Sequence, residues 1–414
     1  MRIVYFTHSL RSCWNHGNAH FLRGVLSELA ALACDVRAYE PAAGWSAQNL
    51  AADNGPEALE AWRSVYPELT TRTYGADFDA EAACDGADLV LVHEWTHPDL
   101  VARLGELRKR GARFRLLFHD THHRAVSDPA SIEGLDLSGY DGVLAFGERL
   151  AEVYRQRGWG RRAYVWHEAA DVRRFRPPER RTLRKGLVFV GNWGDEERSA
   201  ELDSYLFRPA KLAGLPLDVW GVRYPDAARR RLAEAGARYC GWLPNFQAPE
   251  VFAWSAATVH VPRRFYATVL PGVPTIRVFE ALACGVPLLS APWEDTEGLF
   301  RAGRDFLIAR SEHEMAAAMK AIAHDADLRA YLSASGLETI RARHTCAHRA
   351  RELLTIAEEI GSNVVHFDEA RAARRTQLSE ARSFKPGEGT VEPMLHTVDQ
   401  SRAPTPQGEP DVVH

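Results

Sequence analysis

Residues 271–290 combine side chains and local structure that could bind a nucleotide diphosphate. Proline and glycine at the start of this segment disfavour regular structure, and Thr275 can cap a helix that ends at Gly285. The first backbone N–H groups of a helix are unpaired and attract anions. Arg277 adds a permanent cation in that first turn, and Glu280 lies three residues further on the same face. We expect phosphates at the amides and ribose hydroxyls at Glu280. The alternative is an ordinary capped helix with an internal ion pair.

Two other segments place small or basic residues directly after apolar strands. Residues 191–194, Gly-Asn-Trp-Gly, lie at a predicted turn from strand to helix, where backbone N–H groups can approach a phosphate. Arg263 and Arg264 follow another strand, so at least one should reach a cleft at the carboxyl end of a sheet. The alternative for residues 191–194 is an ordinary capping turn, and the alternative for Arg263 and Arg264 is a pair of surface arginines. The residues predicted to bind the nucleotide diphosphate are Gly191, Asn192, Arg198, Arg263, Thr275, Arg277 and Glu280.

Histidines and an aspartate gather at the end of the apolar strand predicted at 114–119, in the sequence His-Asp-Thr-His-His. Titratable groups at the carboxyl end of a strand are typical of functional sites. We predict that His119 or Asp120 acts as a general base that takes a proton from a substrate hydroxyl. The same side chains can ligate metals, but neighbours in the chain rarely converge on one ion, so no metal site is predicted.

Polar residues also lie in loops near the N-terminus. Gly17 and Asn18 belong to a long loop that enters a helix, and they are candidates for contact with a phosphate or an acceptor. The loop lacks the G-x-G-x-x-G spacing of a dinucleotide site. His93 and Glu94 end another strand and are candidates for the acceptor pocket, with capping of the next helix as the alternative.

The elements that would position these residues alternate between strand and helix. Strands are predicted at 2–6, 36–39, 89–93, 114–119, 142–145 and 163–166, and helices at 19–33, 98–110 and 148–157. After a linker the alternation restarts, with strands at 186–190, 217–220, 258–261, 287–290 and 306–308, a long helix from about residue 196 and a last helix at 338–360. Such alternation implies parallel sheets covered on both faces, with ligands at the carboxyl ends of their strands.

We therefore predict an α/β protein of two doubly wound, Rossmann-like domains that face each other across a cleft. Residues 1–167 form the acceptor-side domain, 168–178 the linker, and 179–362 the donor domain with a C-terminal helix. Residues 363–414, rich in charge, glycine, proline and serine, are predicted to be a disordered tail.

Composition limits the function classes. With 414 residues and 46% hydrophobic residues the chain can build two or three cores. A net charge of −4 and dispersed arginines argue against a nucleic-acid partner. The first residues predict a strand rather than a signal peptide, and no apolar run is long enough to span a membrane. We expect a cytoplasmic protein, with peripheral membrane contact left open. Six scattered cysteines indicate reduced thiols rather than a disulfide framework or zinc site.

Segments in both halves carry a resemblance to a known family. Residues 168–177 are similar to a linker of pattern N-G-V-D-x-x-x-F-x-P, and residues 279–287 to a donor-site pattern E-A-x-A-C-G-x-P. Residues 297–306 are similar to the stretch that follows it. The chain thus resembles the GT-B nucleotide-sugar glycosyltransferases, especially the bacterial branch of spore-maturation-type, glycosyltransferase family 1-like proteins, over roughly residues 1–360. Retaining members often carry a second glutamate eight positions before the residue that matches Glu280, and here that position is Gly272.

The resemblance implies a glycosyltransferase that moves a sugar from a nucleotide-diphosphate sugar to an unidentified acceptor. It also implies catalysis without a metal ion or other cofactor, and retention at the anomeric carbon. The alternatives are an epimerase or hydrolase of the same fold, which needs no acceptor, and a catalytically silent nucleotide-sugar-binding module, for which Gly272 argues. The sequence does not indicate an oligomeric state.

Overall fold

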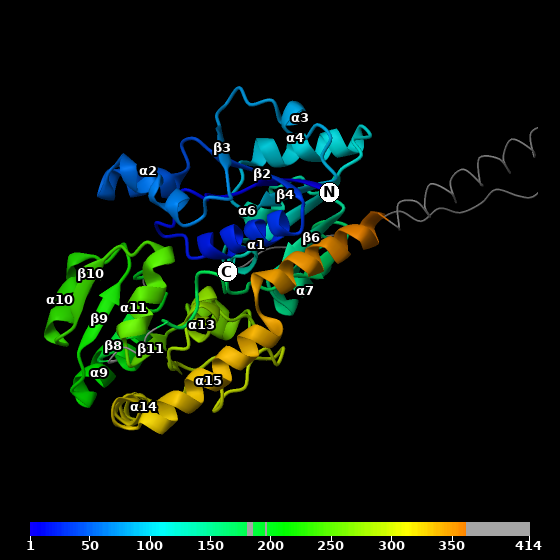
Figure 1. Ribbon diagram of the computed structural model, residues 1–414. Coiled ribbons are helices and arrows are strands. Elements are labelled where there is room, and N and C mark those ends of the chain that lie inside the picture. The colour runs from blue at the N-terminus through cyan, green and yellow to red at the C-terminus, as the bar shows by residue number, and fades with distance from the viewer. Residues whose placement is uncertain (180–184, 195–196, 362–414) are drawn as a thin grey trace, which may run out of the picture. The chain divides into compact units, whose positions relative to one another are not determined.

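Two parallel β-sheets organise the part of the chain that the structure, a computed structural model, describes: residues 1–179, 185–194 and 197–361 (Figure 1). The seven-stranded sheet has the order β3 (Thr71–Tyr74), β2 (Asp35–Pro41), β1 (Arg2–Phe6), β4 (Leu89–His93), β5 (Arg115–Asp120), β6 (Gly142–Ala145), β7 (Ala163–Val165). The six-stranded sheet has the order β10 (Arg238–Gly241), β9 (Leu217–Trp220), β8 (Leu187–Val190), β11 (Ala257–His260), β12 (Leu288–Ser290), β13 (Leu307–Ile308). The predicted α/β fold of two doubly wound domains is confirmed.

Helices connect the strands of each sheet. In the first half they are α1 (Ala19–Ala31), α2 (Trp45–Asn54), α3 (Ala80–Ala83), α4 (Pro98–Lys109), α5 (Arg124–Ser127), α6 (Pro129–Glu133) and α7 (Glu148–Arg157). In the second half they are α8 (Ser199–Leu202), α9 (Arg208–Ala213), α10 (Asp226–Glu234), α11 (Ala248–Trp254), α12 (Arg264–Thr268), α13 (Ile276–Ala283), α14 (Glu312–His324) and α15 (Ala326–Arg343). A π-helical turn, Asp203–Phe207, joins α8 to α9, and together they make the predicted long helix.

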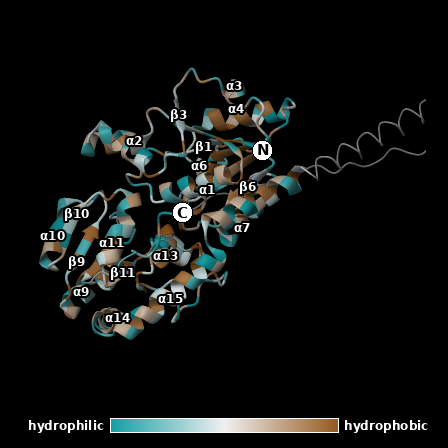
Figure 2. Ribbon diagram, in the orientation of Figure 1, coloured by the Kyte–Doolittle hydropathy of each residue, from teal (hydrophilic) through white to brown (hydrophobic). Residues whose placement is uncertain are grey.

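The central strands are buried over nearly their whole length. Every residue of β4 is buried, and β1 and β5 are buried from their second residue onward. Continuous apolar strands are typical of a parallel sheet that helices cover on both faces. Figure 2 shows hydrophobic residues along strands such as β9, and hydrophilic residues over the outer helix α10. The strand order reverses between β1 and β4 and between β8 and β11. In open α/β sheets, ligands bind at the carboxyl ends of strands beside such reversals.

Two edge strands were not expected from the sequence. β3 and β10 each lie at the border of a sheet and have short polar sequences, Thr-Arg-Thr-Tyr and Arg-Tyr-Cys-Gly. An edge strand pairs on one side only and needs little apolar surface, so hydrophobic patterning gives almost no signal for it.

The predicted single helix at 338–360 is wrong, because the chain interrupts it. α15 ends at Arg343, Thr345 forms a bridge with Ala170, and residues 346–361 are helical again. The Ala170 N–H donates to the His344 carbonyl at 3.0 Å, and the Cys346 N–H donates to the Ala170 carbonyl at 2.9 Å. Backbone groups used in these bonds are withdrawn from the helical ladder, which breaks the helix at this point.

The helix at 346–361 packs on the first half of the chain. The indole N–H of Trp166 donates to the Arg349 carbonyl at 2.9 Å, and Leu353 belongs to the same hydrophobic core as Leu117. A helix assigned to the second domain thus covers the first. The predicted tail, 363–414, lies outside the described residues. None of the helices in the described ranges combines the length and the apolar composition needed to cross a bilayer.

Candidate active site

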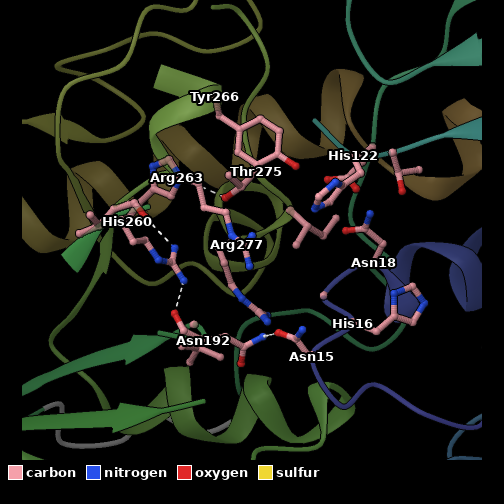
Figure 3. A pocket seen from close by; sticks show the side chains of 18 of the residues that line it. Asn15, His16, Asn18, His122, Asn192, His260, Arg263, Tyr266, Thr275 and Arg277 are labelled. Atoms are coloured by element: carbon pink, nitrogen blue, oxygen red, sulfur yellow. Dashed lines mark hydrogen bonds between the residues drawn. The ribbon is translucent and has the colours of Figure 1, made fainter. Parts of the chain in front are cut away.

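A cavity of about 490 Å³ lies at the carboxyl ends of both sheets, beside the two reversals of strand order. We call it the interdomain cavity. Its wall from the first half comes from the loops after β1, β4, β5 and β6, and its wall from the second half from the ends of β8 and β11 and the starts of α12 and α13. Figure 3 shows the side chains of Arg277, Tyr266 and His122 converging around it from different elements.

Four arginines from the second half line this cavity: Arg198, Arg223, Arg263 and Arg277. The Arg198 guanidinium donates to the carbonyls of Val261, at 2.8 Å, and Asn192. Burial lowers the pKa of Arg198 to about 10, and repulsion by Arg263 and Arg277 contributes to the shift. Mutual repulsion of clustered cations means that the cavity favours an anionic ligand.

Glycines allow the Arg198 side chain to lie against the turn after β8. A Cβ atom on Gly191 would lie 2.8 Å from the ring of Phe189 and 3.2 Å from the Arg198 guanidinium. Gly194 has a φ of +86°, and a Cβ atom there would lie 3.0 Å from Nε of Arg198. Small residues in the predicted Gly-Asn-Trp-Gly turn therefore admit a cation as well as leaving backbone groups accessible.

Thr275 stands at the N-cap of α13 but does not cap it through its side chain. Its Oγ1 lies 3.0 Å from Nε2 of His260, whose Nδ1 lies 2.9 Å from Oγ of Ser290. Burial, with a contribution from Arg198, lowers the pKa of His260 to about 3, so the ring is neutral. A neutral imidazole donates from one nitrogen and accepts at the other, and this chain orients the Thr275 hydroxyl at the start of the helix.

Glu280 lies behind Arg277 rather than in the wall of the interdomain cavity. Its side chain is fully buried, its Oε1 lies 2.8 Å from Nδ1 of His20, and its other oxygen accepts from Arg277. Although burial opposes ionisation, Arg277 and His20 hold the pKa of Glu280 below its usual range. The geometry makes Glu280 the counter-ion that positions Arg277. Its predicted contact with ribose stays a prediction, which this placement does not favour.

His119 and Asp120 are fully buried and do not line the interdomain cavity. The Tyr5 hydroxyl contacts Nδ1 of His119, and the Tyr154 hydroxyl donates to Asp120 at 2.6 Å. The reason is that β5 continues through Asp120, so both side chains still belong to the sheet. The chain leaves the sheet only at Thr121, and His122 reaches the cavity. This placement does not favour the prediction that His119 or Asp120 takes a proton from substrate, which stays a prediction; of this cluster, it is His122 that lines the cavity.

Of the other candidate residues in the first half, some line the interdomain cavity and others are buried behind its wall. Gly17 and Asn18 line the interdomain cavity, and a Cβ atom on Gly17 would lie 3.2 Å from Cγ2 of Ile276, so the loop approaches α13 closely. His93 and Glu94 are buried behind the cavity wall. Glu94 accepts from the backbone N–H of Thr121 at 3.1 Å, which makes it a support for the loop that carries His122.

Gly272 adopts a conformation that excludes a side chain. Its φ is +91°, its N–H donates to the carbonyl of Glu294 at 2.7 Å, and a Cβ atom would lie 2.2 Å from Oγ1 of Thr296. A glutamate at this position would need a different loop. The absence of a glutamate eight positions before Glu280 therefore agrees with the backbone conformation at Gly272.

Several cavity residues were overlooked in the sequence or given another role. His122 was considered only as a metal ligand, Glu168 was assigned to the linker, and His260 and Tyr266 were not singled out, yet all four line the interdomain cavity. His260 ends β11, so the rule that strand ends carry functional groups could have found it. In the described residues, no group of three or more His, Cys, Asp or Glu side chains is arranged to hold a metal ion.

The neutral state of His260 predicts a pH effect on stability. An unfolded histidine takes up its proton near pH 6.5, whereas folded His260 does so only near pH 3, so the unfolded state binds more protons as pH falls. The site therefore subtracts about 2 kcal/mol from the free energy of unfolding between pH 7 and pH 5. Urea unfolding of wild type and His260→Asn at both pH values should show a smaller loss in the variant. Equal losses would contradict the assignment.

Comparisons with known proteins agree with this architecture. Residues 198–355 match a family model described as glycosyl transferase-like. The chain is similar to sucrose-phosphate synthase from Thermosynechococcus elongatus, with 16% identity over 88% of this chain and 100% of that chain and a TM-score of 0.59. It is similar to Anabaena HepE in complex with UDP and glucose, with 13% identity over 87% of this chain and 100% of that chain and a TM-score of 0.62. The DNA-modifying enzyme β-glucosyltransferase gives 11% identity, 87% and 99% coverage and a TM-score of 0.56. No sequence among the curated proteins matches.

These findings define the class of protein: the described chain has the GT-B fold, and the match of residues 198–355 to a glycosyl transferase-like model supports a transferase enzyme. More particularly, its glycosyl transferase-like region is residues 198–355, which contribute Arg198, Arg263 and Arg277 to the cavity. Because the identities to the solved structures are low, they establish the fold alone. The spore-maturation-type branch stays a prediction.

Proposed function

We propose that the protein transfers a sugar from a nucleotide-diphosphate sugar to an acceptor hydroxyl bound on the side of the first half. The observation that carries the proposal is the cluster of Arg198, Arg263 and Arg277 in one cavity, next to the N-terminus of α13. Arg277 and Arg263 have carboxylate partners in Glu280 and Glu197, whereas Arg198 is held by backbone carbonyls. A diphosphate supplies the negative charge that this arrangement favours. HepE, a similar structure, is known in complex with UDP-glucose.

In the proposed reaction the bond between the anomeric carbon and the diphosphate oxygen breaks, and the acceptor oxygen bonds to that carbon. The departing diphosphate keeps the electron pair and is stabilised by the arginines, so the proposal requires no metal ion and no other cofactor. An oxygen of the diphosphate receives the proton of the acceptor hydroxyl on the same face, which gives retention. The resemblance of the α13 segment to retaining enzymes supports this stereochemistry.

His122 is proposed to position the acceptor hydroxyl. It lines the interdomain cavity, and its Nδ1 is buried and has no hydrogen-bond partner in the parts of the chain that the structure describes. Burial, with repulsion from His123 and Arg263, lowers the pKa of His122 well below its usual range, so the ring is neutral and can accept a hydrogen bond from a hydroxyl.

Replacing His122 should impair transfer without impairing donor binding. We expect His122→Ala to lower kcat about 10²-fold, since a misplaced acceptor loses much of the advantage of orientation. Its affinity for the nucleotide should stay unchanged. His119→Ala, at the buried end of β5, is the matched comparison: it should lower thermal stability but affect kcat much less. A wild-type kcat in His122→Ala would remove this residue from the mechanism.

Nucleotide release measured with and without acceptor tests the proposed function. Nucleotide sugars are first screened by thermal shift, and release of nucleotide is then followed with and without acceptor extracts. Transfer predicts acceptor-dependent release that EDTA does not abolish, and NMR of the product reports its anomeric configuration. Acceptor-independent turnover would indicate an epimerase or hydrolase instead. Stabilisation without turnover would indicate a silent binding module, the alternative that Gly272 motivates.

A further inference from the structure

Glu168 is a buried acid in the wall of the interdomain cavity that the proposed reaction does not yet use. It directly precedes the linker residues Ala169 and Ala170, and Glu168 as a whole residue is 3% exposed. No hydrogen bond or ion pair engages its carboxyl group within residues 1–179, 185–194 and 197–361. Burying an acid without a partner costs free energy, so a purely structural role gives no reason for it.

Glu168 faces the interdomain cavity, since it lines the cavity together with Arg277 and Tyr266. It interacts with Arg277, and it raises the pKa of Tyr266; both of these residues also line the cavity. The next acid in the linker behaves differently. Asp171 is 1% exposed, accepts from the backbone N–H of Arg173 at 3.2 Å and does not line the cavity. One linker acid thus supports the backbone, and the other is presented to a ligand.

We propose that the carboxyl group of Glu168 hydrogen bonds the sugar unit of the donor and helps to determine which sugar the site accepts. This inference rests on the proposed function, which assigns the arginines to the diphosphate. The sugar is joined to that diphosphate, so it must lie beside the arginines in the same cavity. Glu168 lines the same cavity as Arg277 but forms no ion pair with it in the described residues, so its carboxyl group is available to the sugar.

The protonation state of Glu168 suits a sugar better than a phosphate. Burial raises the pKa of Glu168 well above its usual range, and the negative charge of Glu280 adds to this effect. A protonated carboxyl group donates one hydrogen bond through its O–H and accepts others at its carbonyl oxygen. Sugar hydroxyls both donate and accept, so a neutral acid can bind two of them without repelling the diphosphate. A charged carboxylate would repel it.

The affinities of Glu168 variants for a nucleotide diphosphate and for its sugar conjugate test this assignment. The probes are UDP with UDP-glucose and GDP with GDP-mannose, and the pair that wild type binds is used in calorimetric titrations. Glu168→Ala should weaken binding of the nucleotide sugar about 10- to 100-fold, since it loses hydrogen bonds in a desolvated site, and leave the affinity for the free diphosphate unchanged. Glu168→Gln, which keeps a donor and an acceptor, should restore most of the affinity.

Asp171→Asn is the matched control, because it changes a buried linker acid that is not in the cavity wall. It should affect both ligands equally or not at all. Thermal unfolding adds a second measurement: Glu168→Ala should be at least as stable as wild type, because an unpartnered buried acid is removed. Equal weakening of both ligands by Glu168→Ala, or unchanged binding of both, would overturn the inference while the proposed function stands. Wild type that binds neither ligand of either pair would overturn both.

Discussion

Arg198→Met is expected to reduce the affinity for a nucleotide diphosphate by more than 10²-fold, which corresponds to about 3 kcal/mol or more for truncating a buried, charged hydrogen-bonding partner. Arg198 is held at the cavity floor by the carbonyls of Val261 and Asn192, and no carboxylate ion pair neutralises it in the described residues. A bound diphosphate would be its first full anionic partner. Calorimetric titration with UDP and GDP measures the effect.

Arg229→Met is the matched control for this variant. Its Nε donates to the Tyr224 carbonyl at 3.0 Å, so it too bonds a backbone carbonyl in the same half, but it does not line the interdomain cavity. We expect its nucleotide affinity to match that of wild type. A folded Arg198→Met variant with near wild-type affinity would show that the diphosphate binds elsewhere.

Glu280→Ala is expected to lower the free energy of unfolding by about 3 kcal/mol, because it removes the fully buried counter-ion of Arg277 and the partner of His20. Glu280 is fully buried against His20 of α1 and Arg277 of α13, so it also connects the two halves. Urea unfolding measures the loss. Combining Glu280→Ala with Arg277→Met should cost less than the sum of the single variants, since the second change removes the unpaired cation.

The exposed pair of Arg264 and Glu201 provides the comparison. A guanidinium nitrogen of Arg264 lies 3.1 Å from Oε1 of Glu201, but the two side chains are 54% and 31% exposed. Glu201→Ala should therefore cost no more than about 1 kcal/mol. A similarly small loss in Glu280→Ala would mean that the buried carboxylate is not the counter-ion that the geometry indicates.

The sheets could be predicted because their central strands are continuous apolar runs, as in β4, which only a doubly covered sheet buries in full. That Arg263 lies in the cavity wall could be predicted for a related reason, since it follows the apolar strand β11 closely. The interruption of the last helix at His344 could not be predicted, because it depends on the pairing of Thr345 with Ala170, which is distant in the sequence. Local helix propensity continues through that point without a signal.

The errors in the site also have physical causes. The spacing of Arg277 and Glu280 shows that they share a face of α13, but not that this face places one in the cavity and the other against His20. For the histidines, the end of β5 was set one residue too early, and the first side chain beyond the sheet that reaches the cavity with a titratable group is His122. Glu168 was assigned to the linker rather than to the site, because a lone acid in a linker is usually solvated.

The backbone pairing of Ala170 with Thr345 means that the chain crosses between its halves twice at one place. Two adjacent, hydrogen-bonded crossings permit rotation about the line that joins them and resist translation of one half past the other. We therefore expect any opening of the interdomain cavity to be mainly a rotation about this line. Points near the axis of a rotation move least, so Glu168, two residues from the pairing, would keep its distance to the arginines more nearly constant than His122 could. A rotation about this hinge would then change how easily an acceptor enters the cavity, while it leaves the contacts of the donor sugar nearly unchanged.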